Sequence, residues 1–155
     1  MIYLFRHTHA GTRRDWDGPD RERPLTERGR HESAVIAERW AGSGITAILS
    51  SPYLRCLESV EAFSRATGLQ IEATPSLEEG ADPELAYSEL TGAREGALLC
   101  THGDIVAALI GRASAEGAGL EDGPAWEKGS IWLLERGPGG RVRAGRYHPP
   151  PVTAL

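Results

Sequence analysis

The chain has 155 residues, a mass of 16.7 kDa and a formal net charge of −5. A chain of this length can bury a core as one domain without disulfide or metal support, and its 40% hydrophobic residues exclude intrinsic disorder and fibrous architectures. The acidic balance disfavours a protein that coats nucleic acid, so we expect no nucleic acid polymer among its partners.

In the first half of the chain, apolar runs of strand length alternate with segments of helix length. A short apolar run predicts a buried strand, alternation of apolar and polar residues predicts an edge strand, and Gly68 is a stop signal for the helix before it. The expected elements are a strand over 2–5, a polar loop over 9–24, a helix over 26–40, a strand over 46–49, a helix over 53–67 and a half-buried or edge strand over 69–73.

The second half continues the alternation and adds a hairpin. Gly137-Pro138-Gly139-Gly140, between two apolar stretches, is typical of a β-hairpin turn. This order predicts an α/β fold, a three-layer sandwich with a mostly parallel central sheet flanked by helices, in a single domain over residues 1–155. The expected elements are a short helix over 83–90, a strand over 97–100, a helix over 105–112, strands over 131–134 and 142–147, and a proline-rich extended tail over 148–155.

Cysteine usage and the apolar runs predict a cytoplasmic protein. Cys56 and Cys100 form no C-x-x-C pair, so we expect reduced, buried thiols rather than a disulfide or a zinc site. The four apolar residues before Arg6 are too few for a signal peptide, and the longest strongly apolar run, 105–110, is too short to span a bilayer. We therefore expect no membrane contact, while the oligomeric state stays open.

Polar side chains follow three of the expected strands directly. The first strand is followed by Arg6-His7, the second by Ser50-Ser51 with Arg55 in the next helical turn, and the third by Thr101-His102-Gly103-Asp104. Parallel strands end at the same edge of a sheet, where open α/β folds bind ligands. We therefore expect two histidines and two arginines at one edge, facing two helix N-termini.

These residue types suit a phosphoryl group. Guanidinium groups and the N–H groups of helix starts bind a phosphate dianion, and an imidazole can attack phosphorus or donate a hydrogen bond to its oxygens. The spacing required of a cysteine phosphatase, a P-loop or an α/β-hydrolase does not occur. We expect a phosphorylated small molecule or phosphoprotein as substrate and no cofactor. We also expect no metal, because the adjacent arginines would repel a cation at His7, His9, His102 and Asp104.

The motifs resemble those of the histidine phosphatase superfamily, which has the phosphoglycerate-mutase-like fold. Thr8 departs from the Gly or Ala that is commoner in the family at that position. The short length most resembles the small SixA-type phosphohistidine phosphatases, and the domain attached to some actinobacterial Nudix hydrolases is also similar. Four motifs occur in the family's order: Arg6-His7-Thr8, Pro24-Leu25-Thr26-Glu27-Arg28-Gly29, Ser50-Ser51-Pro52-Tyr53-Leu54-Arg55 and Thr101-His102-Gly103.

The resemblance implies a role for each matching residue. His7 is expected to be the nucleophile that forms a phosphohistidine intermediate. The side chains of Arg6, Arg55 and His102 are expected to bind the phosphoryl oxygens and to stabilise the charge that develops during transfer. Gly103 completes the expected substrate-binding set.

The general acid is less clearly marked. Family members usually have a carboxylic acid that protonates the leaving group, and the pattern Leu77-Glu78-Glu79 nominates Glu79, with Glu78 as the alternative. SixA-type members can lack such an acid because phosphohistidine has a good leaving group. The sequence therefore also allows that neither glutamate has this role.

The sequence predicts a metal-independent phosphatase acting through phospho-His7 on a phosphate monoester or phosphohistidine. Two alternatives stay open. One is the clean-up of nucleotides or dinucleoside polyphosphates beside a Nudix hydrolase, and the other is a phosphate-recognition module with little turnover. His9 is either a pocket residue or a surface histidine, and the loop over 9–24 is either a lid or a solvated segment.

Overall fold

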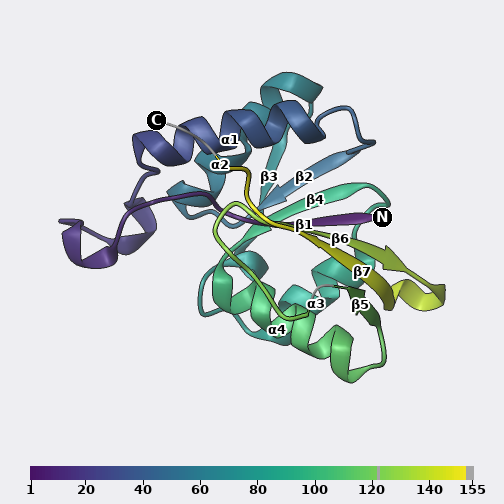
Figure 1. Ribbon diagram of the computed structural model, residues 1–155. Coiled ribbons are helices and arrows are strands. Elements are labelled where there is room, and N and C mark those ends of the chain that lie inside the picture. The colour runs from purple at the N-terminus through teal and green to yellow at the C-terminus, as the bar shows by residue number, and fades with distance from the viewer. Residues whose placement is uncertain (122, 153–155) are drawn as a thin grey trace.

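The longest buried runs of the chain form the centre of its sheet. Every residue of β4 (Ala97–Thr101) is buried, and in β1 (Ile2–Arg6) only Arg6 is partly exposed, as expected for parallel strands covered on both faces. The computed structural model describes residues 1–121 and 123–152, and in these residues seven strands form one sheet (Figure 1). The other strands are β2 (Ala47–Ser50), β3 (Ile71–Ala73), β5 (Gly119–Glu121), β6 (Ile131–Arg136) and β7 (Val142–His148).

The sheet is mostly parallel, as the sequence predicts. The strand order is β3-β2-β4-β1-β6-β7-β5. Only β6 runs antiparallel to its neighbours β1 and β7, whereas all other pairs are parallel. The predicted α/β fold with helices on both faces is confirmed.

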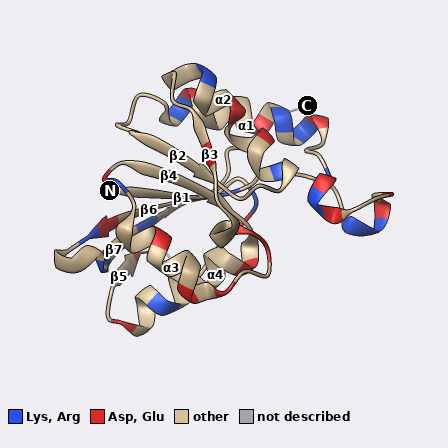
Figure 2. Ribbon diagram, turned by 180° about the vertical axis from the view of Figure 1, so that it is seen from behind, with Lys and Arg blue, Asp and Glu red and all other residues tan. Residues whose placement is uncertain are grey.

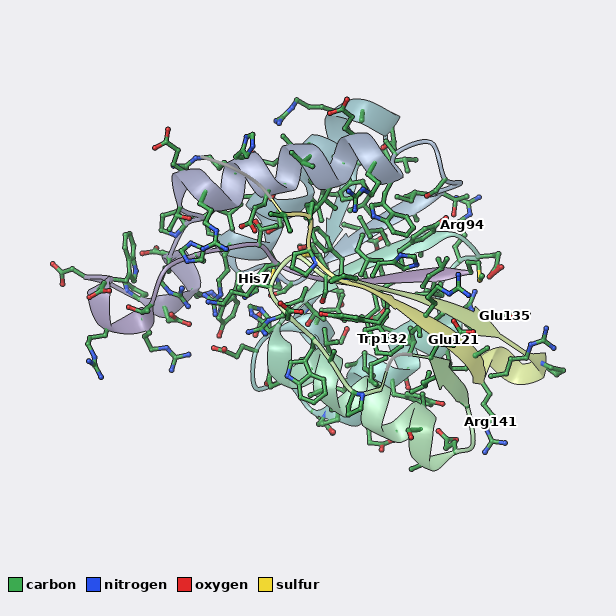
Figure 3. The ribbon with its side chains drawn as sticks, in the orientation of Figure 1. His7, Arg94, Glu121, Trp132, Glu135 and Arg141 are labelled. Atoms are coloured by element: carbon green, nitrogen blue, oxygen red, sulfur yellow. The ribbon has the colours of Figure 1, made fainter. Side chains whose placement is uncertain are left out.

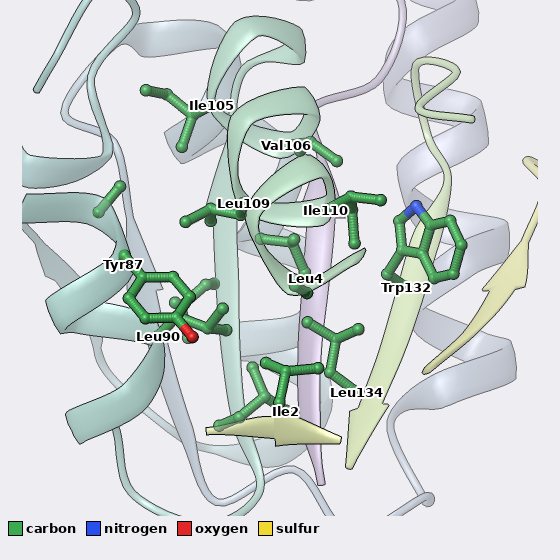
Figure 4. Packing of buried hydrophobic residues seen from close by; sticks show 14 of the residues in the cluster. Ile2, Leu4, Tyr87, Leu90, Ile105, Val106, Leu109, Ile110, Trp132 and Leu134 are labelled. Carbon is green, nitrogen blue, oxygen red and sulfur yellow. The ribbon is translucent and has the colours of Figure 1, made fainter. Parts of the chain in front are cut away.

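Helices cover both faces of the sheet (Figure 1). One apolar cluster joins α3 (Pro83–Gly92) and α4 (Gly103–Ala115) to the sheet, with Leu4, Leu109 and Trp132 among its buried members (Figure 4). The other joins α1 (Glu27–Trp40) and α2 (Leu54–Thr67) to the opposite face. This burial supplies most of the driving force for folding and fixes the strand ends at which the site lies.

The N-terminus of α1 is fixed by a cap and by close packing. The Thr26 hydroxyl accepts a hydrogen bond from the Gly29 N–H at 3.1 Å, an N-cap. A Cβ atom added to Gly29 would lie 2.0 Å from the carbonyl oxygen of His9, so only glycine lets the chain pass this closely. The Pro-Leu-Thr-x-x-Gly motif therefore anchors the segment that follows His7.

Several boundaries differ from those expected. The helix expected over 105–112 covers 103–115, and β7 includes His148, so the proline-rich tail begins at Pro149. The loop over 9–24 contains two short 3₁₀ turns, η1 (Arg13–Asp15) and η2 (Asp20–Glu22). Strand β5 was not expected, because its apolar pattern is too short to detect and it forms by pairing with β7. Residues 153–155 of the expected tail lie outside the described residues.

No helix in the described ranges is long and apolar enough to cross a membrane. Cys56 and Cys100 are free and buried, as the sequence predicts. Two further short 3₁₀ turns, η3 (Pro75–Leu77) and η4 (Pro138–Gly140), complete the element order.

Candidate active site

Strand register brings the expected residues to one edge. Arg6 pairs with Thr101 across β1 and β4, and Ser50 pairs with Cys100 across β2 and β4. Beyond these pairs the chains stay together, because the His7 N–H donates to the Thr101 carbonyl at 3.1 Å. The residues that follow the three strands therefore lie side by side at the carboxyl edge of the sheet.

The two histidines face each other at this edge. The ring centroids of His7 and His102 are 5.4 Å apart at an interplanar angle of 65°. Both side chains are buried, with 4% and 1% exposure. Figure 3 shows His7 at one end of the sheet, next to the loop that carries η1 and η2, and Arg94 at the other end.

A hydrogen bond sets the tautomer of His7. Its Nδ1 lies 2.8 Å from the carbonyl oxygen of Thr8, which can only accept, so Nδ1 carries the hydrogen and Nε2 carries the lone pair in the neutral ring. Thr8 is fixed in turn, since its N–H donates to the Ser59 hydroxyl at 3.0 Å and its own hydroxyl contacts Ser33 and the Gly29 carbonyl. This tautomer leaves on Nε2 the lone pair that a nucleophilic imidazole needs.

Burial keeps the His7 imidazole neutral. Desolvation lowers its pKa well below 6.5, and the charges of His102, Arg55 and Arg6 lower it further against the hydrogen bond to Thr8, which raises it. A depressed pKa means that the neutral, nucleophilic form persists as the pH falls through 6.5.

We therefore expect the ¹⁵N spectrum of histidine-labelled free protein to show His7 as the neutral Nδ1–H tautomer at pH 6.5 and somewhat below. The exposed His31 provides an internal comparison, and a His31→Gln sample assigns its signal. A His7 signal that becomes doubly protonated at or above pH 6.5 would contradict this orientation of the nucleophile.

His102 presents its other nitrogen to the site. Its Nε2 lies 2.8 Å from the Ser51 hydroxyl and 3.5 Å from the Cys56 sulfur. The Ser51 oxygen also accepts a hydrogen bond from the Tyr53 N–H at 3.2 Å, which leaves its hydroxyl hydrogen free to donate to Nε2. In that arrangement Nδ1 carries the ring hydrogen, and this buried Nδ1 makes no hydrogen bond with the described residues.

Arg6 passes directly over the start of α4. Its Nη1 donates to the Trp126 carbonyl at 2.7 Å, and its buried Nε has no partner among the described residues. A Cβ atom on Gly103 would lie 2.7 Å from the guanidinium carbon of Arg6, so glycine is required here. The Thr-His-Gly motif therefore makes room for the arginine of the Arg-His motif.

Arg55 is the most enclosed cation of the site, with 1% exposure. It donates to the carbonyl oxygen of Asp20 at 2.9 Å and to its carboxylate at 3.0 Å, while its Nε has no partner. Burial raises the pKa of Asp20, but hydrogen bonds and charge from Arg23 and Arg55 outweigh burial and lower it to about 2. Asp20 therefore accepts two hydrogen bonds from Arg55, Glu79 accepts a longer one at 3.4 Å, and Nε stays without a partner.

Three buried nitrogen atoms of the expected site make no hydrogen bond with the described residues. They are the Nε atoms of Arg6 and Arg55 and the Nδ1 atom of His102. The two helices that start at this edge, α2 and α4, have no side-chain cap, whereas α1 and α3 are capped by Thr26 and Asp82. Buried donors and uncapped helix starts need hydrogen-bond acceptors, and a bound anion would supply several of them at once.

The two glutamates nominated as the acid lie at the border of the site. Glu79 accepts hydrogen bonds from Arg13 at 2.7 Å and from Arg55 at 3.4 Å, and Glu78 pairs with Arg21 at 3.0 Å. Both pairs join this border to the loop over 9–24, in which basic and acidic residues alternate (Figure 2). Glu79 thus lies nearer to Arg55 than Glu78 does, as a hydrogen-bond acceptor.

The sequence missed two residues at this edge. Asp20 had no local signal, because its role comes from contact with Arg55, 35 residues away in the chain. Lys128 lies in the loop before β6, and the charges of Arg6 and Arg55 help burial to lower its pKa. The described residues contain no group of three or more His, Cys, Asp or Glu side chains arranged to hold a metal ion.

Comparison with known proteins identifies the family. The family model described as the histidine phosphatase superfamily (branch 1) matches residues 2–90. The 8-oxo-(d)GTP phosphatase of Mycolicibacterium smegmatis is 28% identical over 96% of this chain and 48% of its own length. The chain thus spans about half the length of that relative.

Solved structures show the same fold. The protein histidine phosphatase SixA complexed with tungstate aligns with a TM-score of 0.75 and 22% identity over 95% of this chain and 93% of that one. SixA from Agrobacterium tumefaciens aligns with a TM-score of 0.75 and 24% identity over 96% and 97% of the two chains. The phosphoglycerate-mutase-like fold expected from the motifs is confirmed.

Proposed function

Because the chain belongs to branch 1 of the histidine phosphatase superfamily, we propose that it is a metal-independent phosphatase that acts through a phosphohistidine intermediate on His7. The observation that carries this proposal is that three buried nitrogen donors without partners belong to Arg6, Arg55 and His102, whose charges all act on the buried His7. A dianionic phosphoryl group supplies acceptors for all three and accounts for their burial.

The first step is transfer of the phosphoryl group to His7. The Nε2 lone pair forms a bond to phosphorus as the bond to the leaving oxygen breaks, and that oxygen keeps the electron pair. The guanidiniums of Arg6 and Arg55 and the His102 imidazole stabilise charge on the three phosphoryl oxygens. The transition state thereby gains more from these donors than the free substrate does.

The second step is hydrolysis. Water attacks the phosphohistidine, the bond between nitrogen and phosphorus breaks, and the electron pair returns to Nε2. The hydrogen bond from Nδ1 to the Thr8 carbonyl holds the ring in the same tautomer throughout. Orthophosphate leaves, and the enzyme is regenerated without a cofactor.

Glu79 is the proposed proton donor for poor leaving groups. We expect Glu79→Gln to lower kcat/KM for an alkyl phosphate by about 10²-fold or more, and to change kcat/KM for p-nitrophenyl phosphate far less, because an aryl oxide leaves without a proton. Glu78→Gln is the matched control. Unchanged alkyl phosphate rates in Glu79→Gln would show that this glutamate is not the acid.

A nucleotide is the second candidate substrate. The observation in its favour is the likeness to the 8-oxo-(d)GTP phosphatase over 96% of this chain. Nucleoside triphosphates, dinucleoside polyphosphates, phosphohistidine peptides and simple phosphate monoesters should be compared by kcat/KM on one preparation. Selective use of nucleotides supports clean-up of nucleotides, and selective use of the peptide supports phosphoprotein dephosphorylation.

Turnover of p-nitrophenyl phosphate in excess EDTA tests the proposed activity. We expect EDTA to leave the rate of the purified protein unchanged, because the reaction uses imidazole and guanidinium groups alone. Phosphate binding without turnover of any substrate in the panel would instead identify a phosphate-recognition module.

A further inference from the structure

The loop over 126–130 places one more cation beside the phosphoryl site. The Gly129 N–H donates to the carbonyl oxygens of Arg6 at 3.0 Å and His7 at 3.1 Å, and Arg6 donates to the Trp126 carbonyl at 2.7 Å. These bonds fix the loop against the end of β1. Lys128 lies between the anchored residues, so its backbone position is set by the same strand end as the nucleophile.

Lys128 is a cation without an acidic partner. It is the only lysine of the chain, it is half-buried, and its ammonium group makes no hydrogen bond or ion pair with the described residues. Burial lowers its pKa, and the charges of Arg6, Arg23, Arg55 and Arg28 lower it further. A half-buried ammonium group among guanidiniums is unfavourable in the free protein and becomes favourable when an anion binds.

His9 lies near both Lys128 and the start of α1. The Nδ1 atom of His9 contacts the Thr26 hydroxyl at 2.7 Å, and its Nε2 makes no hydrogen bond with the described residues. Burial lowers the pKa of His9, as do the charges of Arg28 and Lys128. Glu32 is the acidic group nearby, and it lies 3.8 Å from Arg28, so Arg28 is partly neutralised while Lys128 is not.

We propose that Lys128 and His9 form a second anion subsite, which binds the phosphate adjacent to the one transferred to His7. The substrate class is then an oligophosphate, either inorganic or the phosphate chain of a nucleotide. This inference rests on the proposed phosphatase function. Arg6, Arg55 and His102 hold the transferred phosphoryl group, and the next phosphate extends toward the loop over 126–130.

The chemistry of an anhydride matches the rest of the site. His7 Nε2 bonds to the terminal phosphorus, the bond from that phosphorus to the bridging oxygen breaks, and the shortened oligophosphate leaves with the electron pair. Such a leaving group needs no proton donor, and Glu79 accepts hydrogen bonds from Arg13 and Arg55 in this structure. Water then releases orthophosphate from His7.

The test compares Lys128→Met with the parent on inorganic tripolyphosphate and on p-nitrophenyl phosphate, which has no second phosphate. We expect kcat/KM for tripolyphosphate to fall about 10- to 100-fold, mostly through KM, and to fall much less for p-nitrophenyl phosphate. Lys128→Arg should recover most of the loss. Arg94→Met, which removes an exposed cation at the opposite end of the sheet (Figure 3), should change neither rate.

Equal losses on both substrates in Lys128→Met would overturn the subsite and leave the phosphatase proposal standing. Failure of the parent to hydrolyse tripolyphosphate and nucleoside triphosphates, while it hydrolyses p-nitrophenyl phosphate, would also overturn the subsite. Failure on all of these substrates would instead count against the phosphatase proposal itself. Equal kcat/KM for tripolyphosphate and a nucleoside triphosphate supports recognition of the phosphate chain alone. Preference for the nucleoside triphosphate supports a nucleotide substrate.

Discussion

His7→Ala is expected to lower kcat/KM for p-nitrophenyl phosphate by about 10⁴-fold or more, because the variant has no nucleophile to form the covalent intermediate. No other group replaces His7 easily. The neighbouring His102 uses its Nε2 for contacts with Ser51 and Cys56, and it presents Nδ1 to the site as a donor. The rate should be measured in EDTA with protein whose folding is checked by thermal unfolding.

The matched control is His31→Ala, which removes an exposed imidazole from α1 and should keep the parental rate. His7→Gln provides a second variant, in which the side chain is closer in volume to histidine than alanine is. A loss of activity in both variants cannot be attributed to a cavity alone. A His7→Ala protein that folds and retains most of the activity would remove His7 as the nucleophile.

Arg55→Met is expected to lower kcat/KM by about 10³-fold, because it removes a preorganised guanidinium from the phosphoryl oxygens. It should also destabilise the fold. Asp20 keeps its charge at neutral pH, and without Arg55 its partly buried carboxylate loses one hydrogen bond and its backbone carbonyl loses another. The temperature of thermal unfolding should fall, and the inhibition constant of inorganic phosphate should rise.

A double variant separates the two effects of Arg55. In Arg55→Met with Asp20→Asn, the carboxylate that has lost its Arg55 partner is gone, so stability should recover in part while activity and phosphate affinity stay low. Recovery of activity together with stability would show that Arg55 acts only by holding the loop over 9–24. Arg55→Lys, which keeps a charge without the planar fork, should lie between the parent and Arg55→Met in rate.

The site residues that can be predicted from the sequence are those that lie next to a local strand or helix pattern. Arg6, His7 and His102 directly follow buried apolar runs, and Arg55 lies in the first turns of the next helix. Once the strands are parallel and in register, their shared edge follows. The four residues were therefore accessible from motif spacing and fold class together.

The remainder depends on contacts between segments that are distant in the chain. Asp20 contacts Arg55 only because the loop over 9–24 folds back over α2. Lys128 lies beside the site because the Gly129 N–H donates hydrogen bonds to carbonyl oxygens at the end of β1. Strand β5 forms by pairing with β7 and has no apolar run of its own. Neither periodicity nor composition carries such information, because each describes only a short window of sequence.

Phosphorylation of His7 can be observed by mixing the parent protein with ³²P-labelled substrate, quenching rapidly without acid and mapping the labelled peptides. We expect one labelled site, His7, with a phosphoryl bond that is labile to acid and stable to alkali, and no label in His7→Ala. A labelled residue other than His7, or steady turnover by a protein that never becomes labelled, would contradict a mechanism through phospho-His7.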